Sequence, residues 1–96
     1  MPVLAPSFQS AVLIPCKISQ GMFSTEAAVE LTFEGKTVSL FADRDFIVER
    51  AGQAYLRVKL VGENGKPANK TVLLPTEAFE SGSSWLSVPE REIVPL

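Results

Sequence analysis

The chain has 96 residues, of which 46% are hydrophobic and 21% are charged, and its formal net charge is −2. This length fits one domain, because typical domains have about 50 to 200 residues, and the composition is that of a globular protein and argues against disorder. The slightly acidic balance gives no overall attraction to nucleic acid or to acidic membranes. We therefore expect one small soluble domain over residues 1–96.

The first part of the chain predicts an irregular arm followed by a strand. Residues 1–9 contain two prolines and no periodic pattern, so we expect no regular element there. From Ser10 to Ile18, every second residue is apolar, which is typical of a strand with one buried face. Leu13 falls on the opposite face, so this strand is expected to be partly covered on both sides. Pro15 has no N–H to donate, which favours an edge strand or a bulge at that position.

The stretch from Phe23 to Ala42 carries the clearest pattern and predicts two strands joined by a two-residue turn at Glu34–Gly35. In this register Leu31 lies opposite Val38, and the large aliphatic side chains share one face. The register requires a primed turn, in which a glutamate is unfavourable. The alternative for the first half of this stretch is a helix, because three glutamates recur there every four residues. The β-branched residues and the long alternation of apolar and polar residues favour strands.

The remaining elements follow from turn residues that separate short apolar runs. We expect, in order, a turn at 43–45, a short apolar piece at 46–48, a turn at 51–53, a strand at 55–61, a long loop at 62–69, a strand at 71–74, one helical turn at 76–79, a polar loop at 80–84, a strand at 85–88 and a C-terminal tail at 89–96 that docks through Ile93 and Val94.

This succession of elements predicts an all-β fold. Five or six short strands with one late helical turn are typical of a small antiparallel barrel or sandwich, of the SH3-like or OB-like kind. Such barrels carry many unrelated functions, so the fold class by itself assigns none.

The residues of the chain argue against catalysis. There is no histidine, which removes the commonest general base and the commonest metal ligand. Cys16 is the only cysteine and lies in an apolar run, where a cysteine is usually a small buried hydrophobe rather than a reactive thiol. Asp43, Asp45 and Glu49 are interpreted as turn residues that cap local backbone N–H groups. We expect no enzyme activity, no cofactor and no metal site.

Three aromatic residues point away from the inward faces of their strands: Phe41, Tyr55 and Trp85. If these rings converge, they form an exposed apolar surface of the kind that marks a partner site. The alternative is a second, minor core in which terminal segments cover the rings.

A basic strip lies beside one of these rings, since Arg57 and Lys59 alternate with inward residues on the same predicted strand as Tyr55. Outward Tyr, Arg and Lys side chains can stack on and neutralise single-stranded nucleic acid. The alternative interpretation is a solvated strand face with cross-strand charge pairs.

The leading hypothesis is a non-catalytic interaction module or accessory subunit that binds a protein partner, or a second copy of itself, through Phe41, Tyr55 and Trp85 with Arg57 and Lys59 at the rim. Single-stranded nucleic-acid binding is the alternative. The N-terminus does not resemble a signal peptide and no apolar run is long enough to span a membrane, so we expect a cytoplasmic protein without a membrane partner.

Overall fold

The computed structural model of the protein describes residues 11–63 and 69–96. In chain order the elements are β1 (Ala11–Gln20), β2 (Glu26–Phe33), β3 (Lys36–Asp43), the 3₁₀ turn η2 (Arg44–Phe46), β4 (Ile47–Arg50), β5 (Gln53–Glu63), β6 (Asn69–Leu73), β7 (Trp85–Pro89), the 3₁₀ turn η3 (Glu90–Glu92) and β8 (Val94–Pro95). The predicted arm at 1–9, Ser10 and most of the loop predicted at 62–69 lie outside the described residues.

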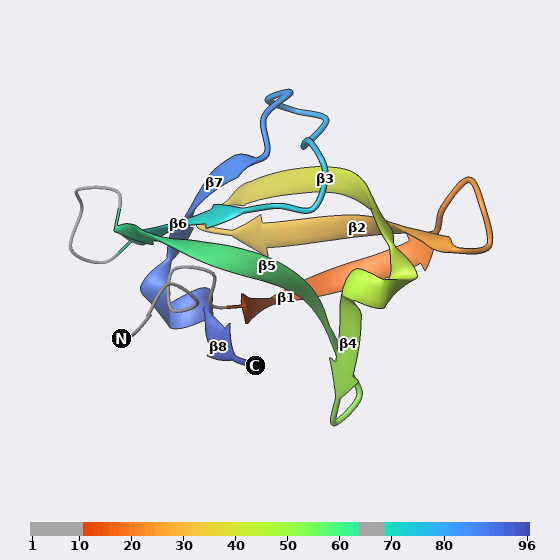
Figure 1. Ribbon diagram of the computed structural model, residues 1–96, viewed down its shortest axis with the longest axis horizontal. Coiled ribbons are helices and arrows are strands. Elements are labelled where there is room, and N and C mark those ends of the chain that lie inside the picture. The colour runs from red at the N-terminus through yellow and green to blue at the C-terminus, as the bar shows by residue number, and fades with distance from the viewer. Residues whose placement is uncertain (1–10, 64–68) are drawn as a thin grey trace, which may run out of the picture.

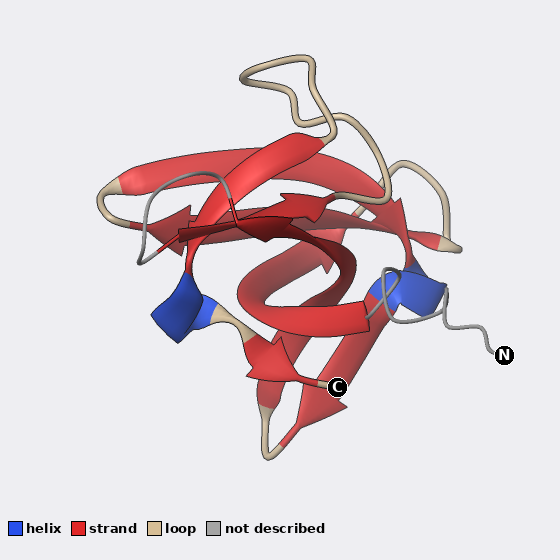
Figure 2. Ribbon diagram, turned by 60° about the vertical axis from the view of Figure 1, so that its left-hand side comes forward, coloured by secondary structure: helices blue, strands red, loops and turns tan. Residues whose placement is uncertain are grey.

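The described strands form one antiparallel sheet in the order β3-β2-β1-β5-β6-β7. β4 pairs with β5 and β8 pairs with β1 beside this path, and these short strands raise the number above the predicted five or six. The sheet curls around a common interior into a half-barrel, as Figure 1 and Figure 2 show from two sides. The expected all-β class and small barrel architecture are confirmed.

β2 and β3 form the predicted hairpin in the predicted register, with Leu31 opposite Val38. The helical alternative for this stretch is therefore wrong. β2 begins at Glu26 rather than at Phe23, because the preceding residues form a turn in which the Glu26 N–H donates to the Phe23 carbonyl at 3.0 Å. The Glu26 carboxylate also accepts the N–H of Met22 at 3.2 Å, which fixes the start of the strand.

The hairpin turn has the primed geometry that the register requires. Glu34 has φ +53° and Gly35 has φ +74°, so both central residues are left-handed. Glycine adopts this conformation freely, whereas a glutamate in it costs about 1 kcal/mol. The hydrophobic register thus holds Glu34 in an unfavourable backbone conformation.

One apolar core fills the interior of the half-barrel. Its buried members are Val12, Ile14, Cys16, Ala27, Val29, Leu31, Phe33, Leu40, Ala42, Leu56, Val58, Val72, Leu74, Ala78 and Val88. Leu13 is also fully buried, although it lies on the outward face of β1, opposite Arg57 of β5 and Val94 of β8. The prediction that β1 is covered on both sides is confirmed at this position.

The helical turn predicted at 76–79 is wrong. This segment contains bends and a later turn, in which the Gly82 N–H donates to the Ala78 carbonyl at 2.8 Å. The groups that a local helix would use are engaged elsewhere, because the Phe79 N–H donates to Ser39 of β3 and the Thr76 hydroxyl donates to the Phe41 carbonyl. Residues 75–84 therefore form a loop that covers part of the edge of β3.

The C-terminal tail docks as predicted. Val94 pairs with Leu13 of β1, and Ile93 packs against the core. Arg50 at the end of β4 donates to the Pro95 carbonyl at 3.1 Å, which joins the β4–β5 hairpin to the tail.

The turn geometry generates a stability prediction. Replacing Glu34→Asn should stabilise the protein by about 1 kcal/mol in urea unfolding, because asparagine tolerates the left-handed conformation that Glu34 adopts. Glu34→Gln is the matched control, since both variants lose the exposed contact between Glu34 and Arg91 at 3.8 Å. Equal stabilities of the two variants would contradict the strain assigned to this turn.

Candidate functional site

Three of the five predicted site residues lie on one face of β5. Leu56 and Val58 are buried, and Tyr55, Arg57 and Lys59 alternate with them and point to the outward face. This arrangement follows directly from the period of two in the sequence.

Trp85 belongs to the same outward face. Lys59 of β5 lies opposite Leu73 of β6, and Leu73 lies opposite Trp85 at the start of β7. Directly opposite residues of antiparallel strands project on the same side, so these three side chains form one row across the strands. The Trp85 side chain is 57% exposed. The row therefore presents an exposed indole, an aliphatic side chain and a cation together.

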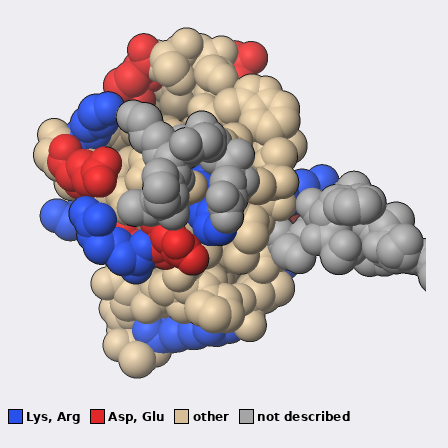
Figure 3. Space-filling model, turned by 90° about the vertical axis from the view of Figure 1, so that its left-hand side faces the viewer, with Lys and Arg blue, Asp and Glu red and all other residues tan. Residues whose placement is uncertain are grey.

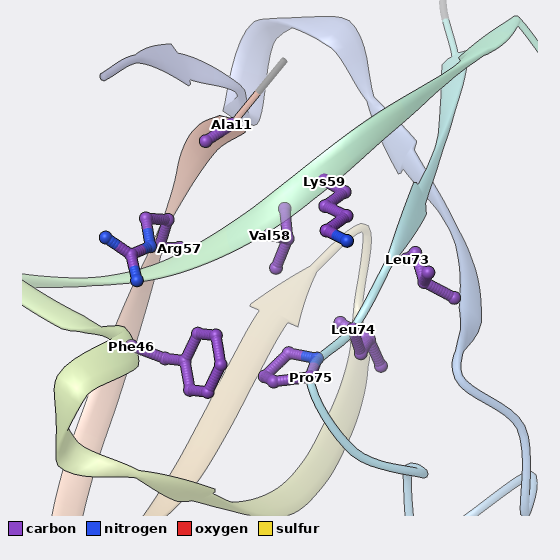
Figure 4. Close-up of a pocket in the computed structure, with 8 residues that line it drawn as sticks. All are labelled: Ala11, Phe46, Arg57, Val58, Lys59, Leu73, Leu74 and Pro75. Carbon is purple, nitrogen blue, oxygen red and sulfur yellow. The ribbon is translucent and has the colours of Figure 1, made fainter. Parts of the chain in front are cut away.

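A pocket of about 360 Å³ opens beside this row, at a break in the edge of β5. On this edge β4 pairs with β5 as far as Leu56, and β6 begins to pair at Lys59. Among the described strands, none pairs with Arg57 and Val58 on that side. The two neighbouring strands diverge here, so that side chains from both faces of the sheet line one pocket (Figure 4).

The walls of the pocket are mostly apolar. Phe46 at the end of η2 faces Pro75 across the opening, and Val58 points between them (Figure 4). The remaining lining residues are Ala11, Arg57, Lys59, Leu73 and Leu74. No carboxylate lies among these eight described residues, and their charges are those of the cations Arg57 and Lys59.

Arg57 is held in place by an aromatic ring. Its guanidinium carbon lies 5.5 Å from the centre of the Phe46 ring, a cation–π distance. Within the described part of the chain, neither Arg57 nor Lys59 takes part in an ion pair. The pocket thus offers one positioned and one exposed cation that can receive an anionic group.

Tyr55 lies further along the same face and is half-buried. It is opposite Pro15 of β1 and Val48 of β4, and it is absent from the pocket lining. Tyr55 therefore contributes less exposed surface to this face than Trp85 does.

Phe41 is located on a different part of the sheet, where its ring packs edge-to-face on Phe79 with the centroids 5.1 Å apart. The two rings belong to the contact between β3 and residues 75–84. Among the described residues, the Phe41 ring makes no ring contact with Tyr55 or Trp85. The partner role predicted for Phe41 stays a prediction, and its ring is separate from the pocket.

Glu80 completes this cover over β3. Its carboxylate accepts the Ser39 N–H at 2.8 Å, and the Ser39 carbonyl accepts the Phe79 N–H at 2.8 Å. The hydrogen bond from the Ser39 backbone lowers the pKa of Glu80 below its ordinary value. Both backbone groups of Ser39 on the outer edge of β3 are therefore satisfied, which protects this edge from pairing with another strand.

Of the three acidic turn residues, Asp43 acts on the local backbone. Asp43 caps η2 by accepting the Asp45 N–H at 2.9 Å, as expected from the sequence. Among the described residues, no group of three possible metal-ligating side chains was found. On the face shown in Figure 3, basic and acidic side chains lie beside one another along one flank.

Cys16 lies in the core, where burial raises the pKa of its thiol to about 11. A thiol with this pKa stays protonated at neutral pH and is a poor nucleophile. The interpretation of Cys16 as a small buried hydrophobe is confirmed.

Sequence reasoning missed Phe46, Leu73, Pro75 and Phe79. Leu73 could have been found, because it is an apolar residue on the outward side of the strand predicted at 71–74. Phe46 carries no such signal, since its contact with Arg57 joins residues from two different elements. Phe79 lies within the misassigned helical turn, which hid its 61% exposed ring.

Comparisons with family models, with curated proteins and with solved structures gave no match to this chain. In the described ranges, no helix has the length and hydropathy needed to span a bilayer.

The buried thiol generates a pH prediction. Its folded pKa of about 11 lies above the unfolded value, so its contribution to stability is present below the unfolded pKa and is lost as the pH rises toward 11. Relative to Cys16→Ala, the wild-type protein should lose about 2 kcal/mol of unfolding free energy between pH 7.5 and about pH 10.5. Urea unfolding of both proteins at each pH measures this difference, and a constant difference would contradict the assignment.

Proposed function

We propose that this protein is a non-catalytic module that binds a protein partner, or a second copy of itself, through the outward face of β5, β6 and β7. The observation that carries the proposal is the row formed by Lys59, Leu73 and Trp85. Exposed tryptophan beside an aliphatic residue, with cations at the rim, is the composition of an interface hot spot.

The charges and the rings have separate roles in this proposal. Trp85 and Leu73 supply the apolar area that association removes from water, at roughly 25 cal/mol per Å². Arg57 and Lys59 set the orientation and the association rate through long-range attraction to an acidic partner surface. Phe41 and Phe79, which belong to the contact between β3 and residues 75–84, are not needed for this contact.

The absence of histidine from the sequence and the raised thiol pKa of Cys16 support a role without catalysis. The free, buried cysteine also fits a reducing compartment such as the cytoplasm.

Single-stranded nucleic acid is a second candidate, because the same row combines an exposed indole with a lysine two strands away. Stacking of a base on the indole would quench its fluorescence, and the effect would disappear with added salt. The net charge of −2 favours a protein partner instead.

Trp85 is the only tryptophan of the chain, so intrinsic fluorescence reports on this face alone. We predict that its emission moves to shorter wavelength as protein concentration rises, or as the partner is added, because association buries the indole. Trp85→Ser should weaken association about tenfold or more in light scattering or partner capture, with urea unfolding nearly unchanged.

Phe23→Ser is the matched control, since the Phe23 ring is 66% exposed on the turn between β1 and β2. It should leave association unchanged. An equal loss in both variants, or full association of Trp85→Ser, would contradict the proposed face. Quenching by oligothymidylate at low salt, without any concentration-dependent shift, would favour nucleic-acid binding instead.

A further inference from the structure

The break in the edge of β5 leaves backbone groups open to the pocket. In an antiparallel strand each residue directs its N–H and C=O to the same edge, and successive residues alternate between the two edges. On the opposite edge of β5, Arg57 pairs with Leu13 of β1 and Val58 pairs with Val12. One of the two residues therefore presents both its N–H and its C=O toward the side that lacks a described partner strand.

The break is too short for a strand to pass through. Ile47 already occupies the position opposite Leu56, and Leu73 occupies the position opposite Lys59. Only two positions lie between them. The pocket volume of about 360 Å³ is at the small end of the range of ligand pockets, about 300 to 1,000 Å³. The site has room for the end of a chain, and no room for an extended segment that enters and leaves.

The chemistry of the walls selects the kind of chain end. The lining charges are the cations Arg57 and Lys59, and the other walls are apolar. Arg57 already lies over the Phe46 ring, a contact that favours this orientation of its guanidinium and reduces the entropy that binding would cost. A carboxylate accepts short charge-assisted hydrogen bonds from guanidinium and ammonium groups. A free N-terminal amine would instead be repelled by both cations.

From these observations we infer that the pocket binds the C-terminal carboxylate of a partner polypeptide whose last side chain is large and apolar. The carboxylate lies between Arg57 and Lys59, and the last side chain lies between Phe46 and Pro75. The backbone of the terminal residue pairs with the open edge of β5. This inference rests on the proposed function, because it names what the partner presents to the same face.

The test is an NMR titration of the full chain with two synthetic hexapeptides, which both end in Val-Leu and differ only in carrying a free carboxylate or a terminal amide. The carboxylate peptide should shift the amide signals of Arg57, Val58 and Lys59 in a saturable way, and the amide peptide should bind about tenfold more weakly or not at all. Equal binding of the two peptides, or shifts located elsewhere, would overturn the inference.

Charge-removing variants test the role of each cation. Arg57→Gln and Lys59→Gln should each weaken binding of the carboxylate peptide about tenfold, and Lys17→Gln, an exposed lysine on β1 outside this pocket, is the matched control. Equal effects of Arg57→Gln and Lys17→Gln would overturn the inference. N-acetyl-leucine tests whether the ligand is a polypeptide end or a free small carboxylate. It should bind more weakly than the carboxylate hexapeptide. Equally tight binding would show that the preceding residues of the peptide add nothing, and would overturn the inference that the ligand is a polypeptide.

The failure of this inference is distinguishable from the failure of the proposed function. Trp85 is not part of the pocket lining, so Trp85→Ser should bind the carboxylate peptide within about twofold of the wild-type protein. Association that depends on Trp85, without peptide binding, overturns only the inference. Peptide binding without any contribution of Trp85 to association overturns only the proposed function.

Discussion

β5 is shared by three partners, and the rest of the structure depends on how they divide it. β1 pairs along one edge, while β4 and β6 take the two ends of the other edge. Neighbouring strands are rotated by roughly 20 to 25° in a twisted sheet, so strands attached at the two ends of a long twisted strand point apart. The divergence leaves Arg57 and Val58 between them and opens the pocket that Phe46 and Pro75 enclose. The curl that closes the core therefore also creates the candidate site.

The half-barrel covers one of its other edges with its own chain. The outer edge of β3 is protected at Ser39, where Phe79 and Glu80 take both backbone groups. The Thr76 hydroxyl adds a hydrogen bond to the Phe41 carbonyl. Residues 75–84 thus serve the stability of the sheet, whereas the outward face of β5, β6 and β7 keeps an exposed indole. This contrast is why the proposed partner contact lies on the latter face.

The sequence was sufficient to predict most of the strands and the register of one hairpin. The register of the β2–β3 hairpin was predictable, because a shift of one residue would move all the apolar side chains of one strand to the solvent face. In the correct register Leu31 lies opposite Val38. The outward positions of Arg57, Lys59 and Trp85 were predictable for the same reason. The pocket was not, because it depends on where β4 and β6 separate. The turn at 76–79 was misassigned because tertiary hydrogen bonds to β3 outweigh local helix propensity there.

The open edge of β5 is the central claim, and amide hydrogen exchange measured by NMR tests it most directly. One of the two amides of Arg57 and Val58 should exchange quickly, while the amides two residues away on either side, which face β4 and β6, should be protected. The other amide of the pair, which faces β1, should also be protected. Slow exchange at both Arg57 and Val58 in the free protein would show that this edge is already occupied, and would contradict the account.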